Sequence, residues 1–186
     1  MKLVLGVTGA TGAAYAARAL VFFRQHREIH VDLVFTKNGR LVWQHEVGEI
    51  PTDFPLWGAG DMTAPFASGS ARYDGMLILP CSAGTMARVA TGVSFDLVGR
   101  AADVMLKERR PLVVVLRETP LSLIQLRNAQ TLVEAGAYVM PASPSFYGRP
   151  TTVEQVLDTV VARALDRLGV PNELVTRWSG LPGSQP

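Results

Sequence analysis

The chain has 186 residues, of which 48% are hydrophobic, and its formal net charge is +2 at pH 7. One compact domain is expected at this length, with enough residues to bury a sizeable core. The small charge gives no indication of nucleic-acid binding, and the single cysteine, Cys81, excludes an internal disulfide and a multi-cysteine zinc site.

The first predicted elements are a strand at 3–7 and a helix at 13–25, joined by the loop GVTGATG. Glycine lets the backbone approach a ligand closely, and the start of the helix offers free N–H groups to a phosphate. The GxxGxxG spacing differs from the GxGxxG of dinucleotide sites, so it supports nicotinamide binding only weakly. A tight strand-to-helix turn without a ligand is the alternative. The apolar N-terminal run is too short for a signal peptide, and no window approaches the roughly 20 apolar residues of a membrane span, so a cytoplasmic protein is expected.

Apolar runs and helical patterns alternate along the rest of the chain. In order, the predicted elements are strand 31–35, helix 38–46, strand 76–79, helices 84–90 and 95–108, strand 112–116, helix 121–134, strand 138–140 and helix 152–167. Residues 47–73 lack periodicity and contain three prolines, which predicts a long functional loop. The strand–helix alternation predicts a single-domain α/β fold, a Rossmann-like (flavodoxin-like) parallel sheet with helices on both faces. We expect this domain to cover 1–178, followed by a flexible tail at 179–186.

Small hydroxyl residues follow two of the predicted strands. Thr36 comes after the second strand, and PCSAGT, with Ser82 and Thr85, comes after the third. These hydroxyls either cap the next helix or meet a ligand at the strand ends. Cys81 in the same segment is interpreted as a buried small residue rather than a nucleophile.

The segment RAADVMLKERRPLVVVLRETP indicates an anionic ligand. Its strand is apolar at every position, which is typical of a strand buried on both faces, and Arg117 and Glu118 follow its carboxyl end, where α/β folds bind ligands. Arg100 and Lys107 on the preceding helix are seven residues apart, so they share one face at roughly 10 Å separation. Asp103 lies between them, and a solvated face with ion pairs within the helix is the alternative.

Two later residues fit the same ligand. Tyr147 lies in the turn-rich SFYGRP after the last predicted strand, and Arg163 is flanked by apolar residues in the last helix, which is unusual for a solvent-facing charge. Arginine, lysine and tyrosine together can hold a phosphate without a metal. The three histidines lack metal-ligand spacing. Glu46, at the end of the second helix, is either a surface charge or an acid–base group beside the ligand.

Several motifs in order resemble the UbiX-like flavin prenyltransferases. They are TGATG at 8–12, TK at 36–37, ASGS at 67–70, PCSAGT at 80–85, the long segment at 100–120 and FYGRP at 146–150. The resemblance runs from residue 3 to about Trp178. It implies FMN binding and metal-independent transfer of a dimethylallyl group from dimethylallyl monophosphate to N5 and C6 of reduced flavin. The prenylated FMN would serve a UbiD-type decarboxylase, in ubiquinone biosynthesis or aromatic acid breakdown.

The resemblance also implies residue roles and an assembly. FMN contacts are implied at Gly9, Ala10, Thr11, Thr36, Ser82, Ala83, Gly84, Thr85 and Arg117. Phosphate and prenyl contacts are implied at Arg100, Lys107, Tyr147, Arg163 and Trp178, and catalytic roles at Glu46, Glu118 and Lys107. Family members typically form homo-oligomers, often dodecamers, whose sites are completed by neighbouring subunits.

Two positions depart from the family pattern. Thr11 stands where serine is common, which keeps the hydroxyl, and Met62 stands where some members carry tryptophan, which makes one side of the prenyl pocket less aromatic.

Two other functions remain open. The FMN-dependent cysteine decarboxylases share the first loop and the PCSAGT region, but they use a histidine base and an asparagine-bearing motif. Here Ala83-Gly84 occupies that motif, and no histidine follows His45. The second alternative is a non-catalytic FMN-binding partner of a decarboxylase.

Overall fold

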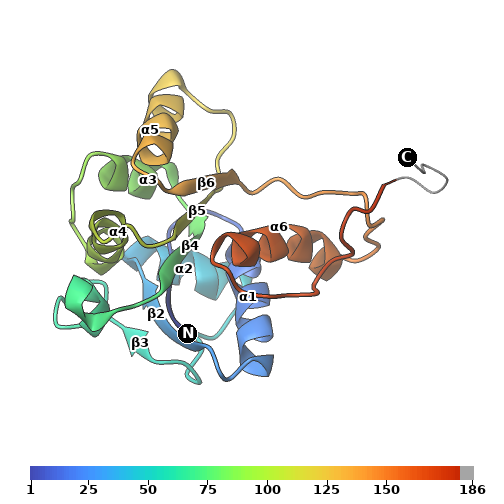
Figure 1. Cartoon of the computed structure of the whole chain (residues 1–186), viewed down its shortest axis with the longest axis horizontal. Coiled ribbons are helices and arrows are strands. Elements are labelled where there is room, and N and C mark those ends of the chain that lie inside the picture. The colour runs from blue at the N-terminus through green and yellow to red at the C-terminus, as the bar shows by residue number, and fades with distance from the viewer. Residues whose placement is uncertain (181–186) are drawn as a thin grey trace.

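The computed structural model describes residues 1–180. Six parallel strands form one sheet in the order β3-β2-β1-β4-β5-β6 (Figure 1). The strands are β1 (Lys2–Val7), β2 (His30–Phe35), β3 (Leu56–Trp57), β4 (Gly75–Cys81), β5 (Leu112–Leu116) and β6 (Tyr138–Pro141). The helices are α1 (Ala13–Gln25), α2 (Lys37–Glu46), α3 (Ala83–Ala90), α4 (Leu97–Lys107), α5 (Leu123–Glu134) and α6 (Val153–Arg167), with 3-10 turns η1 (Pro65–Ala67) and η2 (Gly69–Ala71). The predicted fold class is confirmed.

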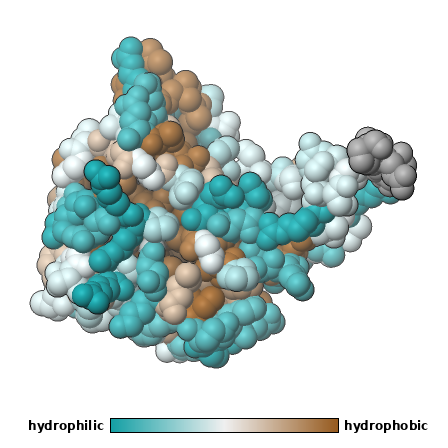
Figure 2. All heavy atoms as spheres, viewed as in Figure 1, coloured by the Kyte–Doolittle hydropathy of each residue, from teal (hydrophilic) through white to brown (hydrophobic). Residues whose placement is uncertain are grey.

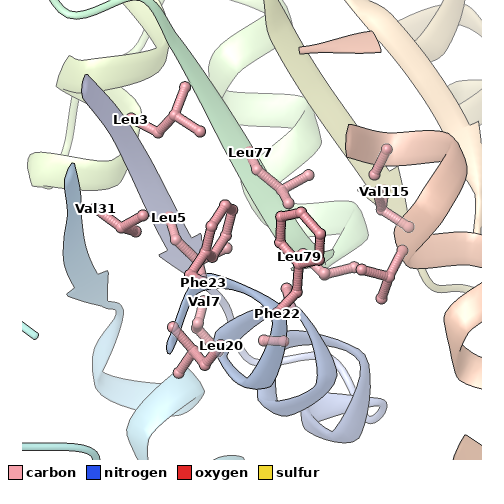
Figure 3. Close-up of a cluster of buried hydrophobic side chains, with 14 of the residues drawn as sticks. Leu3, Leu5, Val7, Leu20, Phe22, Phe23, Val31, Leu77, Leu79 and Val115 are labelled. Carbon is pink, nitrogen blue, oxygen red and sulfur yellow. The ribbon is translucent and has the colours of Figure 1, made fainter. Parts of the chain in front are cut away.

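Helices cover both faces of the sheet, and each face has its own hydrophobic cluster. One cluster joins the sheet to α1, α6 and Trp43 of α2; Figure 3 shows Leu20, Phe22 and Phe23 of α1 packed on strand residues there. The other cluster joins the opposite face to α3, α4 and η1, and to Leu132 of α5. Every residue of β4 and β5 is buried, as expected for central strands covered on both sides.

The chain order creates a topological switch point between β1 and β4. From β1 the chain moves outward through β2 to β3, and it then returns to β4 and moves the other way through β5 to β6. The two-residue β3 completes the six-strand order of a Rossmann sheet, and without it the remaining order is that of a flavodoxin sheet. The carboxyl ends of β1 and β4 therefore flank the place where such folds bind ligands.

Residues 47–73 differ from the expected loop because they contain β3, η1 and η2. A two-residue strand is too short to leave a periodic pattern in the sequence. The buried Asp32 of β2 fixes this region: its carboxylate accepts hydrogen bonds from Trp57 Nε1 (2.7 Å) and Tyr73 Oη (2.5 Å). A second difference is that β4 continues through Pro80 and Cys81, which were expected to lie beyond the strand.

Two further observations concern membrane-spanning helices and the C-terminal tail. No helix within residues 1–180 is long and apolar enough to cross a bilayer. The predicted tail at 179–186 lies outside the described residues except for its first two.

Candidate functional site

The carboxyl ends of β1 and β4 are joined by the side chain of Thr8. Its hydroxyl donates to the carbonyl oxygen of Pro80 (2.8 Å) and accepts from the backbone N–H of Ser82 (2.8 Å). Thr8 is fully buried, so both bonds are shielded from water. This contact sets the distance between the first loop and the loop that follows β4.

The glycines of the first loop are required by the fold itself. A Cβ atom at Gly9 would lie 2.5 Å from Asn38 Cβ, and Gly12 has a φ of +99°. The first position requires close approach to α2, and the second favours a residue without Cβ. The backbone N–H groups of Gly9, Ala10 and Thr11 donate to no protein group within residues 1–180. No protein group of the described residues competes with an anion for these three N–H groups.

Glu46 occupies the N-terminus of α1. Its carboxylate accepts from the backbone N–H groups of Gly12 (2.8 Å) and Ala13 (2.8 Å) and from the hydroxyl of Thr11. Partial burial acts to raise the pKa of Glu46, but these donors outweigh it and hold the pKa below its ordinary value. The prediction that these first N–H groups of α1 are free for a phosphate is wrong, because a carboxylate already occupies them.

The hydroxyl residues after β2 and β4 cap helices. Thr36 Oγ1 accepts from the N–H of Gly39 (3.0 Å) at the start of α2, and Ser82 Oγ accepts from the N–H of Thr85 (3.2 Å) at the start of α3. Arg88 Nη2 donates to Thr85 Oγ1 (3.0 Å). Capping is thus established for Thr36 and Ser82, and their hydroxyls lie at the ligand-binding edge as well. Ala83 and Gly84 form the first turn of α3 at the same edge.

Arg117 lies beside the first loop. Its backbone N–H donates to the carbonyl oxygen of Cys81 (3.0 Å), and its Cγ would lie 3.7 Å from a Cβ placed on Gly12. Burial raises the pKa of Tyr15, and the nearby charge of Arg117 partly offsets this. Arg117 therefore joins the cluster formed by the first loop and Ser82. Glu118 is exposed and accepts from the backbone N–H of Thr119 (3.0 Å).

Arg100 and Lys107 lie on α4, and each is paired with a carboxylate. Arg100 Nη1 donates to Asp103 (2.9 Å), while its Nε donates to the carbonyl oxygen of Ala67 (3.0 Å). Lys107 pairs with its neighbour Glu108. The alternative of ion pairs within the helix therefore describes Arg100, although its contact to Ala67 also ties α4 to η1.

The rings of Tyr147 and Trp178 contact each other, and Arg163 is a residue of α6. The rings of Tyr147 and Trp178 are 5.0 Å apart between centroids. The Arg163 side chain is 58% exposed and pairs with Asp166 (3.0 Å), so the expectation that its apolar neighbours would hold it away from solvent is wrong. Successive helix positions point about 100° apart, and the buried Ala162 and Ala164 therefore face the sheet while Arg163 faces outward.

The four residues expected to bind a phosphate are not brought together within one chain. Arg100 and Lys107 belong to the helix that packs on one face of the sheet, and Arg163 belongs to a helix on the other face. A pocket containing all four would need side chains from more than one chain.

Sequence reasoning missed three residues of these clusters: Thr8, Arg88 and Asp166. Thr8 lies in the first loop, but its partner is more than 70 residues away, so no local signal marks it.

Cys81 is fully buried, and burial raises the pKa of its thiol to about 12, which leaves it protonated at neutral pH. Within residues 1–180, no group of three His, Cys, Asp or Glu side chains has the geometry of a metal site.

Comparison with known proteins identifies the family. The chain matches the family described as Flavoprotein over residues 1–165. It is 44% identical over 198 residues to the flavin prenyltransferase UbiX of Synechocystis sp., with 96% of each chain covered. Two crystal structures are similar over 97% of this chain. AnUbiX (PadA1) in complex with FMN and dimethylallyl pyrophosphate has a TM-score of 0.91, 39% identity and 98% of its own chain covered. The dodecameric FMN-dependent UbiX-like decarboxylase from Escherichia coli O157:H7 has a TM-score of 0.92, 40% identity and 100% coverage.

The cysteine decarboxylases are more distant. The peptidyl-cysteine decarboxylase EpiD is 17% identical with a TM-score of 0.61 and 90% of this chain covered, which is a likeness of fold alone. The chain therefore belongs to the UbiX-like flavin prenyltransferases within the flavoprotein family.

Proposed function

We propose that this chain transfers a dimethylallyl group from dimethylallyl monophosphate to N5 and C6 of reduced FMN and releases phosphate. The observation that carries the proposal is the meeting of the first loop, Ser82 and Arg117 at the β1/β4 switch point in a chain of this family. FMN supplies the nucleophilic ring atoms of the reaction.

The donors at this edge fit FMN. The free N–H groups of Gly9, Ala10 and Thr11 and the hydroxyls of Thr36, Ser82 and Thr85 suit a phosphate and its polyol chain. Ala83 and Gly84 give the ligand close access to the first turn of α3. Arg117 adds a guanidinium on the other side of the first loop.

Glu46 is the acid–base group with the clearest chemistry. Because its pKa is lowered, it is ionised at neutral pH and can accept a proton rather than donate one. Its hydrogen bonds to Gly12 and Ala13 orient the carboxylate at the mouth of the first loop. We assign to Glu118, which is exposed beside Arg117, the second proton-transfer role.

The prenyl phosphate would be held by Arg100, Lys107, Tyr147 and Arg163. Cations around a departing phosphate stabilise the negative charge that develops as the carbon–oxygen bond breaks. Trp178 offers an aromatic face to the cationic allyl group. Since α4 and α6 cover opposite faces of the sheet, we propose that neighbouring chains complete each pocket.

Assembly into a homo-oligomer, by analogy with the E. coli dodecamer, is part of this proposal. Two exposed hydrophobic surfaces support it. Leu121, Leu123, Ile124 and Leu126 lie on and before α5, and Phe146, Tyr147, Val153 and Trp178 lie at the segment around α6. Figure 1 shows α5 and the segment after β6 projecting from the body, and Figure 2 shows hydrophobic side chains over α5. Exposed patches of this kind typically mark protein interfaces.

The product would serve a UbiD-type decarboxylase, and we place the enzyme in the cytoplasm. The cysteine decarboxylase alternative is not favoured, because Ala83-Gly84 replaces the asparagine-bearing motif, no histidine follows His45, and the likeness to that group is one of fold. No observation favours a non-catalytic FMN-binding partner.

Mass spectrometry tests the proposal. The chain is incubated without oxygen with reduced FMN and either dimethylallyl monophosphate or dimethylallyl pyrophosphate. We expect a flavin heavier by one C5H8 unit with the monophosphate. Unchanged FMN with both donors would contradict the assigned reaction, and product from the pyrophosphate alone would contradict the assigned donor.

A further inference from the structure

Asp166 lies at the end of α6 and joins Arg163 to the segment that follows the helix. One carboxylate oxygen accepts from Arg163 Nη1 (3.0 Å) and Arg177 Nη1 (2.5 Å), and the other accepts from Arg177 Nη2 (2.7 Å) and Asn172 Nδ2 (3.1 Å). Only 14% of the Asp166 side chain is exposed, whereas the arginine side chains are more than half exposed. Three side chains from two segments thus converge on one carboxylate.

The segment after α6 depends on such contacts for its position. Residues 171–180 form no helix or strand, so no ladder of backbone hydrogen bonds fixes them. Arg177 Nη2 also donates to the carbonyl oxygen of Asn172 (3.1 Å), and Leu174 packs against the core. Trp178, the next residue, packs its ring at a tilt against the ring of Tyr147. The paired Arg177 is therefore the last polar anchor before Trp178.

The two arginines share Asp166 unequally. Arg177 makes a two-pronged contact, which is the stronger geometry for a guanidinium and a carboxylate, while Arg163 makes a single hydrogen bond. One negative charge facing two positive charges leaves a net positive charge. Arg163 can thus turn toward an arriving phosphate while Arg177 keeps the segment in place.

We propose that Asp166 is a positioning residue for the prenyl-phosphate part of the site: it anchors Arg177, and with it Trp178, and it holds Arg163 ready to move to the phosphate. The inference rests on the proposed function, which assigns Arg163, Tyr147 and Trp178 to that substrate. Asp166 itself does not contact the substrate.

The direction in which the KM for the prenyl phosphate changes distinguishes a positioning role of Asp166 from a general effect of its negative charge. Removal of a negative charge beside an anion site would by itself strengthen phosphate binding. A positioning role gives the opposite result, because Arg177 and Trp178 lose their anchor. Asp166→Asn should therefore raise the KM for dimethylallyl monophosphate about tenfold. It should also lower kcat, because Arg163 and Trp178 act on charge that develops in the transition state, and the affinity for FMN should be unchanged.

The experiment uses the full chain loaded with FMN. KM and kcat are measured for Asp166→Asn, for Asp166→Glu, and for Arg177→Ala, whose side chain is 51% exposed, so its removal leaves the core intact. Asp166→Glu keeps the negative charge, and its KM should lie between the KM of the native chain and that of Asp166→Asn. Glu154→Gln removes a charge from an exposed position of the same helix and should leave both constants as in the native chain.

Acrylamide quenching of Trp178 fluorescence gives a readout besides activity. The signal of Trp178 is isolated by subtracting the quenching of Trp178→Phe, measured in each background. Stronger quenching in Asp166→Asn and Arg177→Ala, together with the higher KM, supports the proposal. A native or lower KM in either variant, or unchanged quenching, overturns it. A native chain that forms no prenylated flavin overturns the proposed function and this inference with it, whereas a productive native chain with unaffected variants overturns this inference alone.

Discussion

Thr8 and Ser82 are 74 residues apart in the sequence, yet a 2.8 Å hydrogen bond from the Ser82 backbone to the Thr8 hydroxyl joins them at the switch point of the sheet. The same hydroxyl donates to Pro80, so one side chain sets the spacing of the two loops assigned to FMN. We therefore expect stability and flavin binding to depend on the same buried group.

Thr8→Val should weaken both properties. Valine keeps the shape but leaves the N–H of Ser82 without its partner, and the carbonyl oxygen of Pro80 keeps only the backbone N–H of residue 8 (3.3 Å). The substitution should lower the free energy of unfolding by about 2 kcal/mol. Flavin fluorescence titration should give weaker FMN binding, and urea unfolding should give the stability loss. Thr8→Ser retains the hydroxyl and is the control. If Thr8→Val binds FMN with native affinity, the Thr8 hydroxyl does not contribute to flavin binding.

The lowered pKa of Glu46 predicts that the free energy of unfolding depends on pH. Its folded-state pKa lies below the unfolded value, so its contribution is present above the unfolded pKa and is lost as pH falls through the folded pKa. Glu46→Gln should therefore be less stable than the native chain at neutral pH, and the difference should shrink in acid. Urea unfolding across a pH series measures this difference. A gap that widens as the pH falls would mean that the hydrogen bonds to the first loop do not stabilise the carboxylate.

Lys107→Ala and Arg163→Ala should each reduce prenyl transfer while FMN remains bound. Loss of one charge-stabilising group should lower kcat/KM roughly 100-fold, measured by mass spectrometry of the flavin product. Arg167→Ala removes an exposed arginine from α6 outside the assigned pocket and should keep native turnover. Native turnover in Lys107→Ala or Arg163→Ala would remove that residue from the phosphate pocket.

Mixed assemblies test whether neighbouring chains complete the pocket. Lys107→Ala and Arg163→Ala chains should each be roughly 100-fold less active on their own. If the two residues of each pocket come from different chains, a co-assembled mixture contains native pairs. In a random one-to-one mixture about a quarter of the pockets should carry both native residues and regain activity. Co-expression with two affinity tags isolates the mixed assembly. A mixture no more active than its components would place both residues of a pocket on one chain.

Arg18 of α1 stabilises the fold through a salt bridge to Asp158. It holds Asp158 of α6 by two hydrogen bonds of 2.9 and 2.7 Å, and the Asp158 side chain is only 9% exposed. Arg18→Ala leaves a buried carboxylate unpaired and should lower the free energy of unfolding by about 3 kcal/mol. Arg24→Ala removes a similar pair with the more exposed Asp53 and should cost less than about 1 kcal/mol. Equal losses in urea unfolding would contradict this dependence on burial.

The sequence by itself determined the fold class and the family. Strands such as 112–116 are apolar throughout, and a buried parallel strand requires that pattern whatever surrounds it. The glycines of the first loop were likewise recognisable because backbone conformation and close approach restrict those positions to glycine. Local patterns of this kind act over a few residues, and they survive in the sequence alone.

Tertiary structure decided which of the recognised residues meet. The spacing of Arg100 and Lys107 gives their separation along α4 but not the face of the sheet that α4 covers, and Arg163 proves to lie on the other face. Glu46 and Asp166 look like ordinary surface charges until folding brings Gly12 and Arg177 to them. Contacts between residues far apart in the chain depend on how helices pack on a common sheet, and no periodicity within one segment encodes that arrangement.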